Sequence, residues 1–425
     1  MDVSNWKNKD AAHVWHPFTQ VKTEAPPLQV VKAEGSLLFT ADGRSYIDCN
    51  SSWWVNIHGH GNAHIGKAIS EQFQRIDQVI FAGVTHQPAV ELATRLTRLL
   101  HPSLQKVFFS DNGSTAVEVA LKMAMQYFHN RGENRTKIMA LNGAYHGDTF
   151  GAMSVGERDM FNRPFEPFFF EVNYLPFPEA DKEAEILEKA AHDFATGAYL
   201  CLILEPLIQG SAGMRIYSVD FLEKLTRLAQ ENEVLVIYDE VMTAFGRTGK
   251  LFAYEHTEVV PDMICLSKGL TGGVLPMGLT VTTNAIFEAF LDDSRVKAFL
   301  HGHSFTGNPL ACAAANASLD LFENSETWQN IERITHYYQE HYKRIAALNR
   351  VQEVRQLGTI FAVELTAEDG GYFAGVRDEI YHYFLENGCL MRPLGNVLYF
   401  NPPYSTTDSQ LETMFRTLIA FLEKN

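Results

Sequence analysis

The sequence lacks several features that would assign it to a specialised class of protein. Its five cysteines are far apart and form no Cys-x-x-Cys pair. This spacing predicts reduced core residues and argues against a disulfide framework or a zinc cage. No run of about 18 uncharged apolar residues is present, so we expect no membrane-spanning helix. The first residues have none of the apolar character of a secretory signal. We therefore expect a cytoplasmic protein.

Dense clusters of basic residues are also missing. Lys and Arg number 35 against 51 Asp and Glu, which gives a formal net charge of −16. Phosphate backbones are bound by clustered Lys and Arg, so this balance argues against nucleic acid as a partner. The remaining composition is typical of a globular protein, with 46% hydrophobic and 20% charged residues. A length of 425 residues predicts one large domain together with a smaller one.

Short apolar runs alternate with amphipathic stretches through the middle of the chain. This alternation is typical of βαβ units, so we predict an α/β fold with a mostly parallel sheet flanked by helices. The predicted strands are Lys106–Ser110, Lys137–Leu141, Tyr199–Glu205, Val234–Asp239, Met263–Ser267 and Met277–Thr282. The predicted helices between them are Thr115–His129, Lys182–Ala195 and Val219–Asn232. In such sheets, ligands bind at the carboxyl ends of the strands.

The last hundred or so residues predict a smaller α+β module. A helix over Leu310–Glu323 leads out of the large domain. Beyond it we predict the helices Trp328–Leu348, Phe373–Glu386 and Ser409–Leu422 and the strands Thr359–Leu365 and Val397–Phe400. Hairpin-like pieces around Gly35 and Asp42-Gly43 are expected to pair with this module. We therefore predict a large domain over residues 51–323 and a small α+β domain formed by residues 1–50 and 324–425.

Two of the predicted buried strands end in residues suited to chemistry. One strand ends in Asp239, whose carboxylate could hold a proton on a ligand nitrogen, or could only cap the following turn. Another ends at Ser267-Lys268-Gly269. Desolvation at this position would lower the pKa of the lysine, as a Schiff-base nucleophile needs. Taken alone, Lys268 fits a solvated strand end equally well.

A third strand is followed by Asn112-Gly113-Ser114-Thr115, which opens a helix. The glycine allows close backbone approach, and hydroxyls beside the free N–H groups of a helix start favour a phosphate. An ordinary Ser/Thr N-cap would account for the same residues. Together, the three strand ends offer a phosphate cradle, an acid for a ring nitrogen and a lysine tether. These are the parts that a pyridoxal phosphate (PLP) site needs.

The stretch Tyr238-Asp-Glu-Val-Met-Thr-Ala-Phe-Gly-Arg-Thr-Gly249, followed by Ser267-Lys268-Gly269, resembles the signature of class III aminotransferases of PLP fold type I. The resemblance covers nearly the whole chain and implies a PLP-dependent aminotransferase with the aspartate aminotransferase-like fold. Finer matches point to members that act in biotin biosynthesis. They are Trp15-His-Pro-Phe-Thr19, Ser51-Ser-Trp-Trp54, Tyr145-His-Gly-Asp-Thr-Phe-Gly-Ala-Met-Ser154, Gln209-Gly-Ser-Ala-Gly-Met-Arg215, Gly307-Asn-Pro-Leu-Ala-Cys-Ala-Ala-Ala315 and Met391-Arg-Pro-Leu-Gly395.

Carried over position by position, the resemblance implies roles for five residues around the cofactor. Lys268 would hold PLP as a Schiff base, and Asp239 would pair with its pyridine nitrogen. Gly113 and Ser114 would bind the phosphate. Tyr145 would pack on the cofactor ring and contact substrate. No metal ion is expected in such a site.

The resemblance also implies a homodimer whose active sites are shared. The neighbouring subunit would complete each phosphate site, here through His303 and Ser304. Trp53 would line the substrate tunnel and Gly302 would contact substrate. Arg392 would meet the substrate carboxylate, which suits a bidentate guanidinium. Judged without the resemblance, Arg392 is more simply a surface arginine and Trp53 a core aromatic.

For this branch of the family, the implied reaction is ping-pong transamination of 8-amino-7-oxononanoate to 7,8-diaminononanoate. S-adenosylmethionine is the usual amino donor, and lysine serves some members. Members that use S-adenosylmethionine carry Tyr where this chain has Phe18, which leaves the donor open. Several members read His-Gly-Pro-Thr-Phe where this chain has His301-Gly-His-Ser-Phe305. Ser304 keeps a hydroxyl for the phosphate.

Other functions stay open on the sequence alone. A class III aminotransferase acting on another ω-amine would share these motifs, and an aminomutase of the same fold would need no second substrate. A zinc hydrolase would need His58, His60 and His64 as ligands, and no acidic or cysteine partner lies nearby. Gly246-Arg-Thr-Gly-Lys250 fails the P-loop pattern, because Leu251 stands where Ser or Thr is required.

Overall fold

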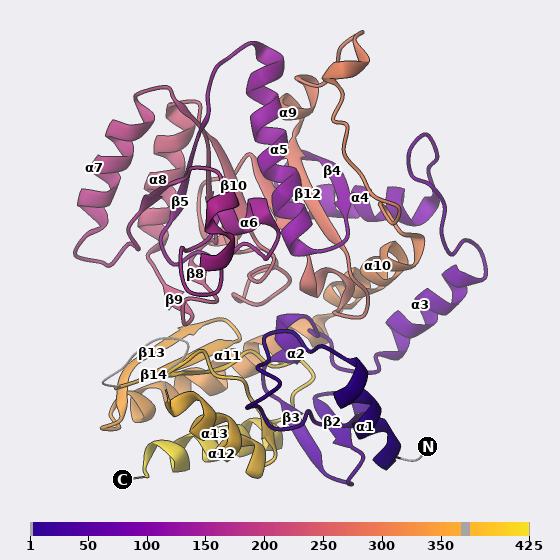
Figure 1. The fold of residues 1–425 in the computed structure, drawn as a ribbon, viewed down its shortest axis with the longest axis vertical. Coiled ribbons are helices and arrows are strands. Elements are labelled where there is room, and N and C mark those ends of the chain that lie inside the picture. Colours follow the sequence, from indigo (N-terminus) through magenta and orange to yellow (C-terminus); the bar gives the residue numbers. More distant parts are fainter. Residues whose placement is uncertain (1–2, 367–374, 425) are drawn as a thin grey trace.

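A seven-stranded sheet forms the centre of the upper part of the molecule (Figure 1). The computed structural model describes residues 3–366 and 375–424. The sheet order is β4-β12-β11-β10-β7-β5-β6. Its strands are β4 (Leu104–Ser110), β5 (Lys137–Leu141), β6 (Asn173–Leu175), β7 (Tyr199–Leu204), β10 (Leu235–Asp239), β11 (Met263–Leu266) and β12 (Gly278–Thr283). Only β12 runs antiparallel to its neighbours, which confirms the predicted mostly parallel sheet.

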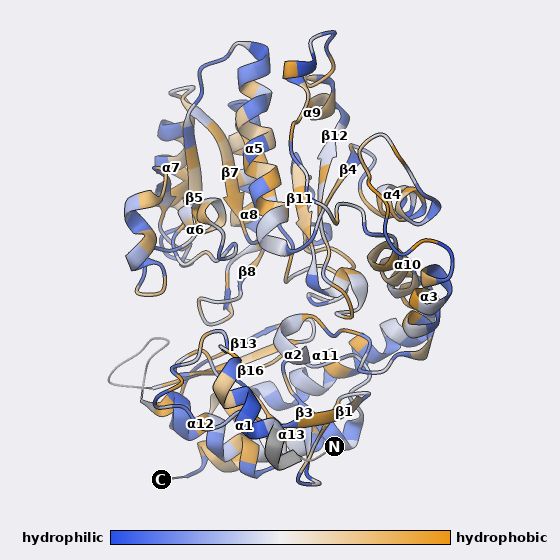
Figure 2. Cartoon of the chain, turned by 45° about the vertical axis from the view of Figure 1, so that its right-hand side comes forward, coloured by the Kyte–Doolittle hydropathy of each residue, from blue (hydrophilic) through white to orange (hydrophobic). Residues whose placement is uncertain are grey.

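Both faces of this sheet are covered by helices. Along β10, Ile237 enters the hydrophobic cluster that contains α5 residues, whereas Val236 and Tyr238 enter the opposite cluster. Burial on both faces explains why the central strands are continuous apolar runs. Figure 2 shows these apolar strands between helices with hydrophilic outer faces. The helices over residues 63–323 are α3 (Ala63–Phe73), α4 (Gln87–Leu99), α5 (Gly113–Arg131), α6 (Phe150–Val155), α7 (Glu183–Phe194), α8 (Val219–Glu231), α9 (Asn284–Glu288) and α10 (Pro309–Glu323).

Short elements connect the strands and helices of this upper part. The 3-10 turns are η1 (Arg163–Phe168), η2 (Ala253–His256), η3 (Lys268–Thr271) and η4 (Arg295–Lys297). A two-stranded ribbon joins β8 (Ile208–Gln209) to β9 (Arg215–Ile216). None of the helices in the described ranges is both long enough and apolar enough to cross a membrane.

The lower part of the molecule combines the two ends of the chain. β1 (Val30–Glu34), β2 (Leu37–Thr40) and β3 (Ser45–Asp48) form one sheet with β15 (Cys389–Leu390). β3 and β15 are parallel, so the predicted pairing of the N-terminal hairpins with the C-terminal module is confirmed. A second, antiparallel sheet contains β13 (Val351–Leu357), β14 (Ile360–Leu365) and β16 (Val397–Phe400). The helices are α1 (Val3–His13), α11 (Ser325–Ala346), α12 (Val376–Glu386) and α13 (Asp408–Leu422).

One hydrophobic cluster unites this lower part. It contains residues of β3 and β15 from the first sheet, of β13, β14 and β16 from the second, and of helices α11, α12 and α13. The helix predicted over Phe373–Glu386 is α12, and residues 373 and 374 lie outside the described residues. The predicted domain boundary at residues 323 and 324 coincides with the junction of α10 and α11. The division into domains itself stays a prediction.

Candidate active site

A cavity of about 390 Å³ opens at the carboxyl ends of the sheet strands, beside the start of α5. Among its lining residues are Gly113, Ser114, Tyr145, Asp239 and Lys268. Asp239 is the last residue of β10, and the other four follow strands β4, β5 and β11. Parallel strands bring their carboxyl ends to one edge of a sheet, so residues far apart in the sequence meet there. The cavity volume is that of an ordinary small-molecule site.

Lys268 follows Ser267, the first residue after β11, and begins η3. Its φ of 46° is left-handed, a conformation that non-glycine residues rarely adopt outside functional or tightly constrained positions. Its Nζ lies 4.5 Å from the centroid of the Trp54 ring. Burial lowers the pKa of Lys268 to about 8, although the Asp239 and Glu205 carboxylates act in the opposite direction. At pH 7, about a tenth of this amine is therefore uncharged and nucleophilic, far more than for a lysine of ordinary pKa.

Asp239 ends β10 and is held by two hydrogen bonds. Its Oδ1 accepts the N–H of Val241 at 3.1 Å, and its Oδ2 lies 2.7 Å from Nδ1 of His146. Both Asp239 and His146 are buried. These bonds orient the carboxylate and leave lone pairs for a ligand N–H. Nε2 of His146 is buried and has no hydrogen-bond partner within the described part of the chain.

The start of α5 forms another wall of the cavity. Asn112 caps the helix, because its side chain accepts the N–H of Thr115 at 2.9 Å. The cap residue is thus Asn112 and not a Ser or Thr, and the Thr115 hydroxyl completes a capping box by accepting the N–H of Asn112 at 3.1 Å. The N–H groups of Gly113 and Ser114 stay in the first turn, where the helix dipole favours an anion. A Cβ on Gly113 would lie 2.7 Å from Cγ1 of Val241, so a larger residue would close this cradle.

Glu205, Trp54 and His146 are lining residues for which the sequence suggested no role. Glu205 follows β7, and its two carboxylate oxygens accept the N–H groups of Gly210 at 3.0 Å and Tyr145 at 3.1 Å. Burial raises the pKa of Glu205 to about 7, while nearby His146 opposes the shift. The sequence does contain a signal for Glu205: it is an acid that directly follows a buried apolar strand, the same kind of signal that identified Asp239.

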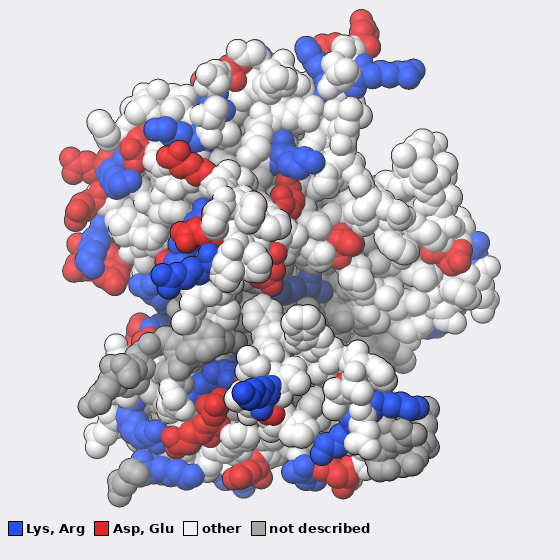
Figure 3. Space-filling view, in the orientation of Figure 1, with Lys and Arg blue, Asp and Glu red and all other residues white. Residues whose placement is uncertain are grey.

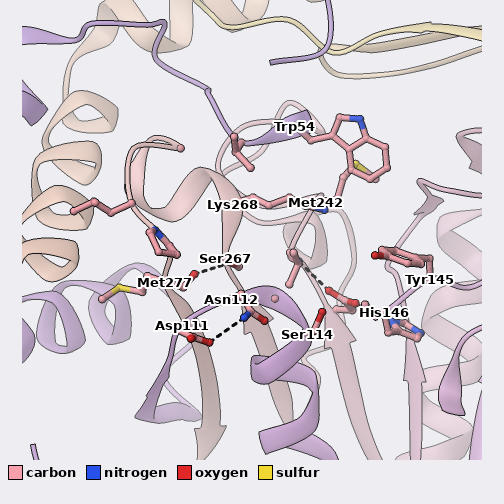
Figure 4. A pocket seen from close by; sticks show the side chains of 18 of the residues that line it. Trp54, Asp111, Asn112, Ser114, Tyr145, His146, Met242, Ser267, Lys268 and Met277 are labelled. Atoms are coloured by element: carbon pink, nitrogen blue, oxygen red, sulfur yellow. Dashed lines mark hydrogen bonds and ion pairs between the residues drawn. The ribbon is translucent and has the colours of Figure 1, made fainter. Parts of the chain in front are cut away.

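Figure 4 shows how these side chains surround the cavity. Trp54 lies on one side of Lys268, and Asn112 and Ser114 lie on the other. Tyr145 and His146 form a flank between the two sides. A planar ligand with an anionic arm therefore fits the arrangement, because the phosphate-favouring helix start, the buried acid and the amine all face one space.

Trp53 and Arg392 are not among the residues that line this cavity. Both are exposed, and they contact each other at the edge of the lower part, with the Arg392 guanidinium 5.3 Å from a Trp53 ring centroid. Phe18 packs edge-on against Trp53, with 5.3 Å between ring centroids. Trp53 directly precedes Trp54, which lines the cavity. The cluster of Phe18, Trp53 and Arg392 therefore adjoins the cavity wall.

The predicted residues Gly302, His303 and Ser304 are also absent from the cavity lining. They lie in the segment between η4 and α10. The carbonyl of Ser304 accepts the side-chain amide of Gln78 at 2.6 Å. Within one chain, these residues do not meet Lys268 or Asp239 in the cavity.

The three histidines considered as zinc ligands have separate partners. The expectation that no acidic partner lies nearby is wrong for two of them, because folding brings distant aspartates to the histidines. The pairs are His58 with Ser318 at 3.0 Å, His60 with Asp48 at 2.9 Å and His64 with Asp320 at 2.7 Å. Across residues 3–366 and 375–424, no group of three or more His, Cys, Asp or Glu side chains is placed to hold a metal ion.

Sequence comparison relates the chain to known enzymes along nearly its whole length. The family model described as aminotransferase class III matches residues 18–422. The adenosylmethionine-8-amino-7-oxononanoate aminotransferase of Synechococcus elongatus is 47% identical over 97% of this chain and 99% of its own. The protein of the same name from Helicobacter pylori is 34% identical over 98% of this chain and 97% of its own.

Solved structures agree in fold. The adenosylmethionine-8-amino-7-oxononanoate aminotransferase of Methanocaldococcus jannaschii superposes with a TM-score of 0.94 at 36% identity, over 99% of each chain. A PLP-bound amine transaminase from an uncultivated Pseudomonas species gives 0.89 at 28% identity, covering 96% of this chain and 98% of its own. The aspartate aminotransferase-like fold expected from the sequence is therefore confirmed.

Proposed function

Because the chain belongs to the class III aminotransferases, a family of PLP-dependent enzymes, we propose that it transfers an amino group to 8-amino-7-oxononanoate, forming 7,8-diaminononanoate in biotin biosynthesis. The observation that carries the proposal is the single cavity lined by Gly113, Ser114, Tyr145, Asp239 and Lys268. These residues supply an anion cradle, an aromatic face, a buried acid and an amine of lowered pKa. Relatives that bear this reaction in their name match over nearly the full chain.

The residues of the cavity fit PLP, and each would have a separate task. Bound PLP supplies an aldehyde that takes up amino groups and a ring that delocalises negative charge. The first-turn N–H groups of Gly113 and Ser114 would hold its phosphate. Tyr145 would pack against the ring. Asp239, oriented by His146, would accept a hydrogen bond from the ring nitrogen and keep the proton there.

Lys268 would perform two tasks in this scheme. Its Nζ would tether the cofactor covalently between turnovers. Once an incoming amine displaces it, the same Nζ would take the proton from the carbon that bears the amino group and return it to the cofactor carbon. The lowered pKa of Lys268 suits a group that must both accept and donate a proton near neutral pH.

The substrate would be oriented from the lower part of the molecule. Arg392 would bind its carboxylate, and Trp53 would line the path of its apolar chain, with Gly302 contacting it from the neighbouring subunit. We propose S-adenosylmethionine as the amino donor, as in the names of the relatives. Lysine is the alternative, because Phe18 stands where the family's S-adenosylmethionine users carry Tyr. Phe18 contacts Trp53, so the donor difference falls beside the proposed substrate path.

A substrate assay tests the proposed reaction. PLP-loaded protein is incubated with 8-amino-7-oxononanoate and, separately, with S-adenosylmethionine, lysine and a simple ω-amine. We expect 7,8-diaminononanoate with one of the first two donors and ping-pong kinetics with two substrates. An aminomutase would show no second substrate. Turnover with the ω-amine and another acceptor, but none with 8-amino-7-oxononanoate, would assign the protein to the amine transaminases that share its fold.

We further propose a homodimer with shared active sites. The stretch from α9 to the start of α10, which includes Gly302, His303 and Ser304, exposes apolar side chains, as subunit interfaces do before association. They are Phe287, Leu291, Val296, Leu300 and Phe305. In a dimer, His303 and Ser304 would complete the phosphate site of the neighbouring subunit.

Small molecules are the other partners proposed. Figure 3 shows basic and acidic side chains interspersed on the face it displays.

A cytoplasmic location is also proposed. The observation that supports it is the state of the cysteines, which are all buried and free. Unpaired thiols are typical of proteins that fold in a reducing compartment.

Uptake of PLP by the cofactor-free protein should rise with pH through about 8. Only the neutral amine of Lys268 attacks an aldehyde, and burial lowers its pKa from 10.5 to about 8. Above pH 8 the rate should level off. The measurement is the rate at which the absorbance of the lysine–PLP adduct develops between pH 6.5 and 10. A rate that still climbs about tenfold between pH 9 and 10 would indicate a lysine of ordinary pKa.

Replacement of Arg392 by alanine should raise the KM for 8-amino-7-oxononanoate about 10- to 100-fold, because a charge-assisted bidentate contact is lost. The kcat should change little, since Arg392 does not reach the reacting atoms. Arg227→Ala, on an exposed part of α8, is the matched control. The methyl ester of the substrate should bind the wild type and the Arg392 variant alike. If Arg392→Ala leaves the KM unchanged, this residue does not bind the carboxylate.

A further inference from the structure

The segment that carries the two adjacent tryptophans has an unusual backbone. All four residues of α2 (Ser51–Trp54) have positive φ, with values of 48°, 52°, 89° and 72°. None is glycine, and a run of L residues in this left-handed region is strained. Such a turn persists only where its surroundings hold it. It matters for the site because it presents Trp54 to the cavity and Trp53 to Arg392.

The carboxylate of Asp48 holds the middle of this left-handed turn. Asp48 ends β3 and is 1% exposed. Its Oδ1 accepts the N–H of Ser52 at 2.9 Å, and its Oδ2 accepts the Ser52 hydroxyl at 2.7 Å. Nε2 of His60 lies 2.9 Å from the same Oδ2, and Nδ1 of His60 lies 3.1 Å from the Asn56 amide nitrogen. The buried carboxylate of Asp48 therefore anchors the turn, and His60 contacts the same carboxylate.

A second set of contacts links the same turn to Arg392. Asn50, between β3 and the turn, accepts the N–H of Arg392 on its Oδ1 at 2.9 Å. Its Nδ2 donates to the carbonyl of Tyr399 at 2.9 Å. The hydroxyl of Tyr399 in turn accepts the indole N–H of Trp54 at 2.9 Å. Trp54 and the backbone of Arg392 are therefore held by one connected network, and the Arg392 guanidinium lies over the Trp53 ring.

We propose that Asp48 and His60 are positioning residues that hold Trp53, Trp54 and, through Asn50, Arg392 in place for the acceptor substrate. This inference rests on the proposed function, in which Trp53 and Arg392 bind that substrate. Neither Asp48 nor His60 lines the cavity. They act by maintaining a strained turn, so their loss affects substrate binding more than the chemical step.

The test compares Asp48→Asn and His60→Gln with a matched control. His64→Gln breaks another His–Asp pair, the more exposed pair of His64 with Asp320 at 2.7 Å, which joins α3 to α10 and lies outside the turn. The PLP-loaded variants are assayed with 8-amino-7-oxononanoate. We expect the KM to rise about tenfold in both variants. Asp48→Asn removes the charged acceptor that holds Ser52, and His60→Gln removes the imidazole that contacts this carboxylate. The kcat should change less than about twofold, and His64→Gln should resemble the wild type.

Tryptophan fluorescence provides a readout that needs no substrate. A relaxed turn exposes Trp54, which is 4% exposed, so the emission should shift to longer wavelength and acrylamide quenching should increase. If Asp48→Asn fails to fold, His60→Gln carries the test, because it keeps the carboxylate. Unchanged fluorescence and KM in His60→Gln, or equal changes in His64→Gln, would overturn the inference. If the wild type does not use 8-amino-7-oxononanoate, the proposed function fails, and fluorescence alone decides the role of Asp48 and His60.

Discussion

Replacement of Lys268 by alanine is expected to lower kcat by at least about 10⁴-fold, because one change removes both the covalent tether and the proton-transfer group. The protein should lose the visible absorbance of its lysine–PLP adduct and should no longer retain PLP after borohydride treatment. The substitution removes only the part of the side chain beyond Cβ and leaves the other lining residues of the cavity unchanged. Turnover is measured by formation of 7,8-diaminononanoate.

A lysine on the outer surface controls for the loss of a positive charge. Lys224 lies on α8, pairs with Asp220 at 2.6 Å and is not among the residues that line the cavity. Lys224→Ala should keep its colour and its kcat. If Lys268→Ala retains near-normal turnover or the adduct band, Lys268 is not the cofactor lysine.

Replacement of Asp239 by asparagine is expected to reduce kcat by about 10³-fold. An amide cannot stabilise a proton on the ring nitrogen as a carboxylate does, so the ring would delocalise the negative charge of the reaction less well. Asparagine keeps the size of the side chain and one oxygen for the N–H of Val241. The variant should therefore fold and bind PLP, with a shifted absorbance band and a low rate of proton transfer.

Asp262 provides a half-buried, hydrogen-bonded carboxylate for comparison. It precedes β11, at the opposite end of the strand from Lys268, and its Oδ2 accepts the N–H of Val236 at 2.8 Å. Asp262→Asn should lower the unfolding temperature and leave kcat within about threefold of the wild type. Equal losses of kcat in both variants would mean that Asp239 acts through stability and not through the cofactor.

Local patterns were sufficient for the core of the fold and for four residues of the site, Gly113, Ser114, Asp239 and Lys268. Lys137–Leu141 and Val397–Phe400 were predicted with the bounds that the structure shows, because buried strands are short apolar runs with clear ends. Lys268 and Asp239 were identifiable because each directly follows such a run. In contrast, β13 has the largely polar sequence Val-Gln-Glu-Val-Arg-Gln-Leu and becomes a strand through pairing with β14. Pairing of this kind leaves little local signal.

The sequence by itself therefore determined the sheet, the lysine at its edge and the family resemblance that supplied the chemistry. Only the tertiary structure decided which distant side chains meet. It paired His146 with Asp239, and it turned Glu205 towards the backbone of Tyr145. It also placed Asp48 under the left-handed turn at Ser52. The physical reason is that hydrogen bonds join residues brought together by the crossing of strands and helices, and their spacing in the chain carries no period that a sequence pattern can record.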